Sequence, residues 1–319
     1  MTTIPQLTIG KHQPKVPIIQ GGMSVLVSNP SLASAVANAG GIGVIGGTGV
    51  EPEKLHNMIV EAKKLTSGII GVNIMVAANH FMDLVKASFE AKVDMIIAGA
   101  GISKQLFKMG QDANVEIVPV ISSARVGEFI EKMGAKAVIV ESGEAAGHLG
   151  TDQPLSEIFA EIKQTLKIPV IAAGGLIDGK GMADMFRLGA DGVQLGTRFV
   201  LSDECDVHDR YKQAYLNARE EDIVTFLSPV GYPGRAILTP FLTEFIRKGN
   251  MKVERCVSCL KSCSHSFCIL DALLKARNGD IENGIVFAGK NVYKIKDILP
   301  VQKIIDNLMH ETREALATN

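Results

Sequence analysis

The sequence predicts an α/β protein built on a (β/α)8 TIM barrel, and two observations lead to that fold. Short apolar runs rich in β-branched residues recur along residues 16–200, and each is followed by a stretch with helical spacing of its apolar positions. The runs are apolar throughout rather than alternating, as parallel strands buried on both faces should be. Eight such units in succession indicate a closed barrel.

The expected elements alternate regularly along the chain. The strands are Val16–Gln20, Ile42–Ile45, Ile69–Met75, Met95–Ala98, Glu116–Ile121, Ala137–Glu141, Pro169–Ala173 and Gly192–Leu195. The helices are Asn29–Ala39, Glu51–Leu65, Met82–Ala91, Ser103–Met109, Ala124–Met133, Leu155–Leu166 and Gly181–Leu188. An open doubly wound sheet shares this alternation but has a single early glycine-rich turn, whereas here glycines follow many strands. That distribution favours the barrel.

Three parts of the chain differ in pattern. Residues 1–201 carry the barrel units, and residues 202–268 carry charge runs, a Pro/Gly stretch and a cysteine group. Residues 269–319 return to helical spacing. We therefore expect a barrel, an accessory or lid segment, and C-terminal helices that pack on the barrel.

Charge and targeting signals exclude several classes of protein. Lys and Arg number 33 and Asp and Glu 34, which gives a net charge of −1 and no overall field to attract nucleic acid. The N-terminus lacks the apolar segment of a signal peptide, and no stretch approaches the length of a membrane span. We expect a soluble cytoplasmic protein with no nucleic-acid or membrane partner.

Two consecutive strand ends suit a phosphate group. AAGGLIDGKG follows the seventh strand and QLGTRF ends the eighth, and barrel enzymes commonly hold a ligand phosphate at these loops through backbone N–H groups. The candidates are Gly174, Gly175, Gly196 and Thr197. The alternative is that these glycines only satisfy tight turns.

His148 is the candidate catalytic residue. It lies in EAAGHLG, a few residues after the sixth strand, on the face where barrel enzymes place catalytic groups. An imidazole between Gly147 and Gly150 can donate, accept or relay a proton. A solvated loop histidine is the alternative.

Other strand ends offer contacts for a flat heterocyclic ring. QGGM places Gln20 and Met23 at the first strand's end, with two glycines that allow close backbone approach. Asn73 ends the third strand and Gln194 lies inside the eighth. A buried amide needs a hydrogen-bond partner, so each either joins a network within the protein or reaches a ligand.

Four of the five cysteines fall within thirteen residues. Cys256, Cys259, Cys263 and Cys268 are separated by two, three and four residues in CVSCLKSCSHSFC. Four thiolates this close can bind zinc or a [4Fe-4S] cluster, and the compact, irregular spacing favours the cluster over zinc knuckles. A set of reduced thiols is the alternative.

The order of these motifs resembles the nitronate monooxygenase and flavin-dependent enoyl-ACP reductase family. The segments that carry the resemblance are IIQGGM, AGGIGVIGG, GVNIM, GAG, EAAGHLG, PVIAAGGLIDGKG and VQLGTRFV, within roughly residues 12–215. The resemblance implies that FMN is bound non-covalently and that His148 is the family's catalytic histidine. The residues that it assigns to the flavin are Gln20, Gly21, Gly22, Met23, Gly46, Asn73, Gly147, Ala173, Gly174, Gly175, Gln194, Gly196 and Thr197.

The resemblance also implies a reaction. QGGM and GVNIM look more like the enoyl reductases, so we expect an FMN-dependent oxidoreductase that uses NAD(P)H to reduce an activated double bond, such as that of an enoyl thioester. The alternatives are a nitronate monooxygenase and a redox-sensing flavoprotein. The expected partner is a small-molecule or acyl-thioester substrate, with an acyl carrier protein and a second copy in a homodimer as candidates. The cysteine group is not typical of the enoyl reductases and leaves the substrate open.

Overall fold

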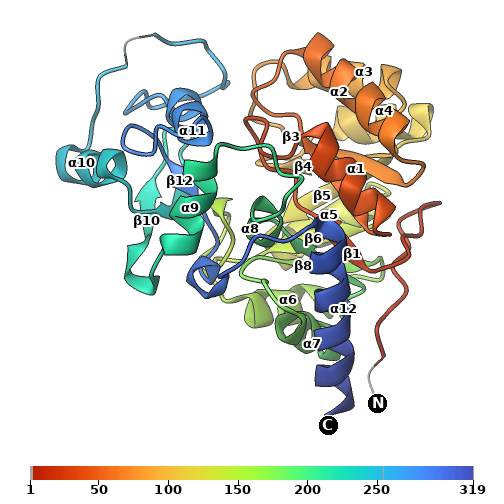
Figure 1. Ribbon diagram of the computed structural model, residues 1–319. Helices are drawn as coiled ribbons and strands as arrows, with labels where there is room; N and C mark the ends of the chain where they lie inside the picture. The colour runs from red at the N-terminus through yellow and green to blue at the C-terminus, as the bar shows by residue number, and fades with distance from the viewer. Residues whose placement is uncertain (1–2, 254, 319) are drawn as a thin grey trace.

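Eight parallel strands close into a barrel in the computed structural model, which describes residues 3–253 and 255–318 (Figure 1). The strands are β1 (Ile18–Gln20), β2 (Ile42–Gly46), β3 (Ile69–Met75), β4 (Met95–Gly99), β5 (Glu116–Ile121), β6 (Val138–Glu141), β8 (Val170–Ala173) and β9 (Gly192–Leu195). Strand β9 pairs with β1, and this pairing closes the ring. The expected fold class is confirmed.

Helices surround the barrel, each following a strand. They are α1 (Pro30–Asn38), α2 (Pro52–Leu65), α3 (Phe81–Glu90), α4 (Lys104–Ala113), α5 (Ala124–Lys132), α6 (Leu155–Lys163), α7 (Gly179–Arg187) and the short α8 (Thr197–Val200). Local sequence sets their ends. Asn29 caps α1 by accepting a 2.8 Å hydrogen bond from the backbone N–H of Leu32, and Asn114 ends α4 in the left-handed conformation.

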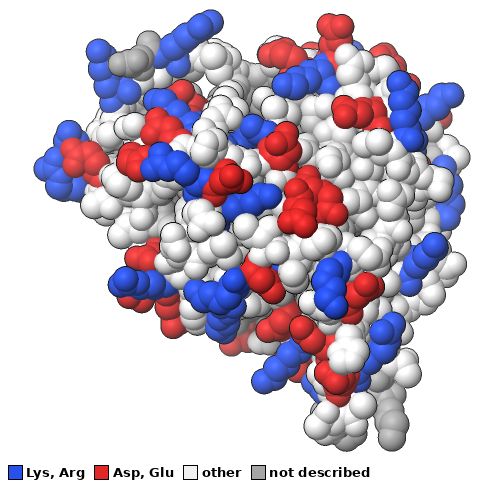
Figure 2. Space-filling view, viewed as in Figure 1, with Lys and Arg blue, Asp and Glu red and all other residues white. Residues whose placement is uncertain are grey.

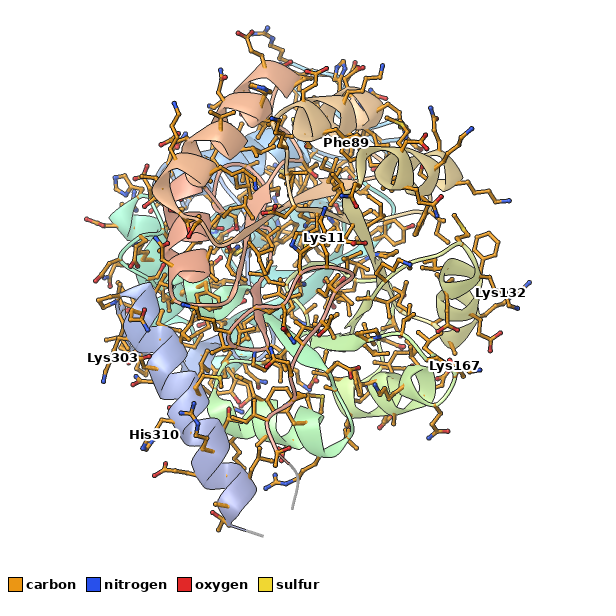
Figure 3. The ribbon with its side chains drawn as sticks, turned by 90° about the vertical axis from the view of Figure 1, so that its right-hand side faces the viewer. Lys11, Phe89, Lys132, Lys167, Lys303 and His310 are labelled. Carbon is orange, nitrogen blue, oxygen red and sulfur yellow. The ribbon has the colours of Figure 1, made fainter. Side chains whose placement is uncertain are left out.

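The N-terminal segment closes one end of the barrel. Leu7 and Ile9 are fully buried and pack into the barrel interior with Ile42 and Ile171. In Figure 3 the segment that carries Lys11 crosses the centre of the ring of helices. Because this end is plugged by apolar side chains, a ligand must enter from the opposite end, at the C-terminal ends of the strands, which we call the barrel mouth.

A second unit lies to one side of the barrel (Figure 1). Strands β10 (Ile223–Leu227), β11 (Pro233–Ile237) and β12 (Val286–Phe287) form an antiparallel sheet, and the two-residue β7 (Gly147–His148) pairs with β11. We call these four strands the accessory sheet. The remaining helices are α9 (Asp209–Asn217), α10 (Pro240–Lys248), α11 (Ile269–Arg277) and α12 (Val301–Ala317), with 3-10 turns at Glu220–Asp222 and Val292–Lys294.

The last two helices pack against different parts of the molecule. Helix α11 packs with β12 in the second unit, whereas α12 lies on the barrel exterior against α7 and α1. None of the helices within residues 3–253 and 255–318 is long and apolar enough to cross a membrane.

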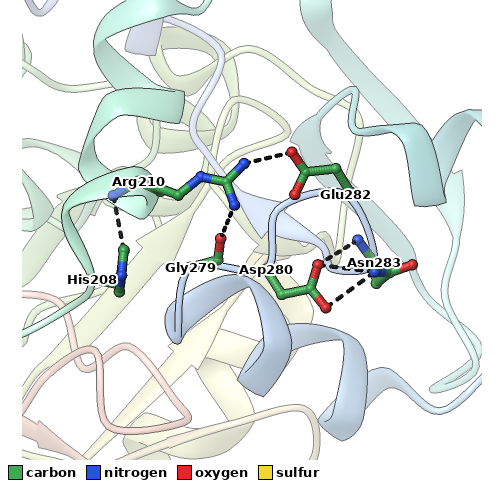
Figure 4. Close-up of polar contacts among 6 residues, drawn as sticks. All are labelled: His208, Arg210, Gly279, Asp280, Glu282 and Asn283. Carbon is green, nitrogen blue, oxygen red and sulfur yellow. Dashed lines mark hydrogen bonds and ion pairs between the residues drawn. The ribbon is translucent and has the colours of Figure 1, made fainter.

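Polar contacts hold the start of α9 against the turn that follows α11 (Figure 4). The Arg210 guanidinium donates to the carbonyl of Gly279 at 3.0 Å and forms a 2.5 Å ion pair with Glu282. Gly279 has a φ of +96°, a conformation that favours glycine. At the other end of α9, the Tyr215 hydroxyl donates to the backbone carbonyl of Phe287 at 2.6 Å. These contacts fix α9 to the accessory sheet.

Charges of both signs are intermixed on the face shown in Figure 2. Lys and Arg side chains lie beside Asp and Glu over both the barrel and the second unit, and no broad single-sign surface covers this face. The pattern agrees with the net charge of −1.

The plug at the closed end of the barrel should contribute strongly to stability. Leu7 is fully buried against Gly192 of β9, so Leu7→Ala leaves a cavity and should lower the free energy of unfolding by about 2–5 kcal/mol. The measurement is urea denaturation of the protein. Leu65→Ala is the matched control, because Leu65 is 52% exposed and its loss should cost no more than about 0.5 kcal/mol. Equal midpoints for the two variants would contradict the role of the plug.

Candidate active site

A cavity of about 300 Å³ opens at the barrel mouth. It is lined by the C-terminal ends of the strands, by the loops that follow them and by parts of the second unit. Most of the residues predicted from the sequence lie on its wall: Gly21, Gly22, Met23, Asn73, Gly147, His148, Ala173, Gly174, Gly175, Gln194, Gly196 and Thr197. The fold therefore brings together residues of β3, β7, β8 and β9 and of the loops that follow β1, β8 and β9.

Two predicted residues do not reach the cavity. Gln20 is fully buried, and its amide is satisfied within the protein by the backbone N–H of Val44 at 3.1 Å and the hydroxyl of Ser28 at 2.8 Å. At Gly46 an added Cβ would lie 1.9 Å from the backbone oxygen of Met23. Both residues instead contact the loop that follows β1, Gln20 through Ser28 and Gly46 beside Met23.

The loops after β8 and β9 form a cradle of small residues. Gly174 and Gly175 have φ values of +109° and +71°, and a Cβ on Gly174 would lie 2.4 Å from the hydroxyl of Ser142. A Cβ on Gly196 would meet only Met23, with the nearest atom 3.8 Å away, so a side chain there would extend into the cavity. These positions leave room and exposed backbone for a ligand group.

The two predicted amides both face the cavity, with different partners. Asn73 donates from Nδ2 to the carbonyl of Gly22 at 2.7 Å and so fixes the loop after β1. The Oε1 atom of Gln194 is buried without a hydrogen-bond partner among the described residues. A buried, unpartnered acceptor is costly, so Gln194 fits a ligand that brings an N–H or O–H donor.

His148 is held by the second unit. The backbone of Gly147 and His148 pairs with Arg235 and Gly234 of β11. The imidazole Nε2 lies 2.8 Å from the hydroxyl of Ser228, and the ring stands edge-on to Phe287 with centroids 5.2 Å apart.

Ser228 influences which imidazole nitrogen carries the proton. The Ser228 hydroxyl oxygen also accepts a hydrogen bond from the backbone N–H of Val230 at 3.4 Å. Ser228 can donate its own proton to Nε2 of His148, and in that arrangement the imidazole proton lies on Nδ1. Burial lowers the pKa of His148 from its ordinary 6.5 to about 4, so the ring is neutral at physiological pH.

Arg235 braces the loop that leads to His148. Its guanidinium donates to the carbonyl of Gly143 and, at 3.2 Å, to that of Ala145. Burial lowers the pKa of Arg235, while the charge of nearby Glu144 acts in the opposite direction. The side chain remains charged, because guanidinium groups lose their proton only far above physiological pH.

Several cavity residues were not identified from the sequence. Glu141 ends β6 and lines the cavity, and Tyr211, Phe287 and Asn291 reach it from the second unit and its following loop. A carboxylate directly after a buried apolar strand was a usable signal for Glu141. The other three lie far along the chain, where no local pattern connects them to the barrel.

The segment 256–268, which we call the cysteine loop, covers part of the barrel mouth. The backbone N–H of Asn79 donates to the carbonyl of Cys259 at 3.2 Å, and that of Lys261 donates to Ala77 at 3.0 Å. Lys261 also donates from Nζ to the carbonyl of Val76 at 2.6 Å. The loop is thereby docked on the segment between β3 and α3, and its Cys259 lines the cavity.

The predicted metal centre is not supported. Within residues 3–253 and 255–318, no group of three or more His, Cys, Asp or Glu side chains has an arrangement that could hold a metal ion. All four thiols of the loop are free, and Cys256 is exposed. Cys256 and Cys263 each accept a 3.4 Å hydrogen bond from the backbone two residues later, so their sulfurs belong to local turns. The spacing suggested a ligand set that the docked loop does not form.

Comparisons with known proteins identify relatives of this chain. A model of the nitronate monooxygenase family matches residues 6–92 and 80–311. A (3aS,4S,5R,7aS)-5-hydroxy-7a-methyl-1-oxo-octahydro-1H-indene-4-carboxyl-CoA dehydrogenase from Rhodococcus jostii (strain RHA1) is 32% identical over 238 residues, which are 74% of this chain and 66% of that protein. The protein of the same name from Mycobacterium tuberculosis (strain ATCC 25618 / H37Rv) is 34% identical over 237 residues, with 73% and 66% coverage. The match thus spans just under two thirds of these relatives.

Solved structures agree with the fold. FabK from Thermotoga maritima has a TM-score of 0.86 and 34% identity, over 95% of this chain and 94% of that one. A nitroalkane oxidase from Streptomyces ansochromogenes has a TM-score of 0.83 at 22% identity, over 95% and 97% of the two chains, and supports the fold alone.

The hydroxyl of Ser228 should matter for His148. In Ser228→Ala the imidazole loses its partner, which should lower turnover by about 2- to 12-fold, the range of one neutral hydrogen bond of 0.5–1.5 kcal/mol. Nitrogen NMR of the imidazole should show the two tautomers mixed instead of one. Ser156→Ala is the control, because Ser156 is exposed in the first turn of α6 and does not line the cavity. An unchanged tautomer and rate in Ser228→Ala would contradict this role.

Proposed function

The chain belongs to the nitronate monooxygenase family, and on that premise we propose that it is an FMN-dependent oxidoreductase that reduces an activated double bond of an acyl thioester with NAD(P)H. The observation that carries the proposal is the cavity at the barrel mouth, where small residues, the unpartnered Gln194 and a neutral His148 face the same space. The relatives named as carboxyl-CoA dehydrogenases support a thioester substrate, whether its carrier is coenzyme A or an acyl carrier protein.

The residues around the cavity fit FMN. The backbone of Gly175, Gly196 and Thr197, which line the cavity, would hold the phosphate, since the described residues of the cavity wall include no Lys or Arg. Gly21, Gly22 and Met23 leave space for a flat ring, and Gln194 offers Oε1 to a ring N–H. When bound, FMN supplies hydride transfer.

His148 would act as a neutral hydrogen-bond donor. Negative charge develops on the carbonyl oxygen of a thioester when its double bond accepts a hydride, and a fixed donor stabilises that charge. When Ser228 donates to Nε2, the Nδ1–H of His148 is left for this purpose. Gly147 and His148 are held by β11, so the donor is positioned before the substrate arrives.

Nitronate oxidation is the second candidate. Proteins of Staphylococcus aureus named "Probable nitronate monooxygenase", such as that of strain MSSA476, are 29% identical over 273 residues, 72% of this chain and 77% of theirs. A nitronate is an anion, and the same neutral donor at His148 suits it.

Anaerobic mixing distinguishes the two reactions. We expect NADH or NADPH to bleach the absorbance of the FMN-loaded protein without oxygen, and crotonyl-CoA to restore it, because the reductant and the double bond use the same cofactor. Stopped-flow absorbance measures both steps. Bleaching by an alkyl nitronate but not by NAD(P)H would contradict the reductase and favour the monooxygenase, while failure of both would favour a redox-sensing flavoprotein.

Removing the imidazole should affect rate more than flavin binding. His148→Ala should retain FMN and lower turnover of crotonyl-CoA by about 10²-fold, the scale of losing one donor to a developing oxyanion. His310→Ala is the matched control, because His310 lies exposed on α12 at the barrel exterior (Figure 3). If His148→Ala turned over at the rate of the control, His148 would have no part in the reaction.

A further inference from the structure

The carboxyl group of Glu141 is not used by the function proposed above. Glu141 is the last residue of β6, where it pairs in register with Ala173 of β8, and it lines the cavity at the barrel mouth. No hydrogen bond or ion pair joins its carboxylate to another described residue. The side chain is half-buried, and an acid on a cavity wall with no partner inside the protein is a candidate for contact with a ligand.

Burial alone sets the ionisation of Glu141. It raises the pKa of the carboxyl from 4.5 to about 7, with no contribution from a neighbouring charge. In the loop after β6, Glu144 forms a 3.4 Å ion pair with Lys290 and its charge acts on Arg235, but neither cation affects the pKa of Glu141. Glu141 therefore exchanges its proton near neutral pH.

The other titratable groups on the cavity wall stay neutral at that pH. Burial holds the pKa of His148 at about 4 and raises that of Tyr211 to about 12. The pKa values of Tyr215 and Cys259 are also raised, mainly by burial. Among the described residues of the wall, Glu141 alone combines a position in the cavity with a proton that it can release and recover under physiological conditions.

We propose that Glu141 is the proton donor of the active site, a role that rests on the proposed reduction of an acyl-thioester double bond. The β-carbon receives a hydride, and the electron pair of the double bond moves toward the thioester carbonyl, whose oxygen is hydrogen-bonded by His148. The O–H bond of Glu141 then breaks, and a C–H bond forms at the α-carbon. The Glu141 carboxylate recovers a proton from water. One hydride and one proton are added, so the reaction balances.

Reduction of FMN and its reoxidation can be measured separately, and only reoxidation should depend on Glu141 as a proton donor. In Glu141→Gln, reduction of FMN by NAD(P)H should keep the wild-type rate, because that step needs no proton at the α-carbon. Reoxidation by crotonyl-CoA at pH 6.5 should slow by about 10²-fold, the usual scale for an acid–base group. In the wild type the reoxidation rate should fall as the pH rises through about 7, where Glu141 loses its proton, and this decline should be absent in Glu141→Gln.

A matched control and an independent readout accompany these kinetics. Glu157→Gln makes the same change at an exposed position in the first turn of α6 and should match the wild type. Infrared difference spectra of the FMN-bound protein between pH 6 and 8 should show the carbonyl stretch of a carboxylic acid disappearing in the wild type and in Glu157→Gln, and no such band in Glu141→Gln.

The outcomes are distinguishable. If crotonyl-CoA never reoxidises the flavin but the infrared band titrates near pH 7, the proposed function fails while the ionisation of Glu141 stands, and the role as donor to a thioester is overturned with it. If the thioester is reduced and Glu141→Gln reoxidises at the wild-type rate, only the donor role is overturned. Slowed reoxidation together with the loss of the infrared band establishes it.

Discussion

The backbone pairing of Gly147 and His148 with β11 is the contact on which the rest of the site depends. A loop after a barrel strand would normally leave its side chains free to move, because nothing on the barrel itself pairs with it. Here the loop becomes an edge strand of the accessory sheet, and Gly147 takes a φ of +79° to enter it. The imidazole is therefore held by the second unit, whose strands β10, β11 and β12 come after the last barrel strand in the sequence.

Hydrogen bonds also join the accessory sheet to segments that are distant in the sequence. Strand β11 lies between β10 and β12, and β12 also supplies Phe287, whose ring stands edge-on to that of His148. Tyr215 holds α9 to the backbone of β12, and Arg210 holds the start of α9 to the turn after α11.

The barrel and part of the site could be predicted from the sequence. The physical reason differs from one element to another. Parallel strands covered on both sides must be apolar, so a run such as Ile69–Met75 could be identified residue for residue. Gly174 and Gly175 were identified because small residues follow the seventh strand, where barrels commonly hold a phosphate, and their φ values of +109° and +71° also explain why glycine is needed there. The pairing of β7 could not be predicted, since two residues carry no periodicity and their partner β11 lies some eighty-five positions away.

The cysteine loop shows that close spacing does not by itself establish a metal centre. Four thiols form a ligand set only if they converge on one point, and no such group is found within residues 3–253 and 255–318, although Cys256, Cys263 and Cys268 lie near enough to act on the pKa of Cys259. The backbone of the loop is bound to Ala77 and Asn79 of the barrel. The loop also meets the turn beside Ser228, where the backbone N–H of Ser264 donates to Pro229 at 3.0 Å. It therefore bridges the barrel to the turn that holds His148.

The same docking decides what Cys259 contributes. Burial raises the pKa of its thiol, so it faces the cavity as a neutral group and behaves as a small apolar residue instead of a nucleophile. Burial also moves the pKa values of Glu141 and His148 in opposite directions, so both groups can be neutral in the same cavity. A wall whose titratable groups can all be neutral suits an acyl chain and a flat ring.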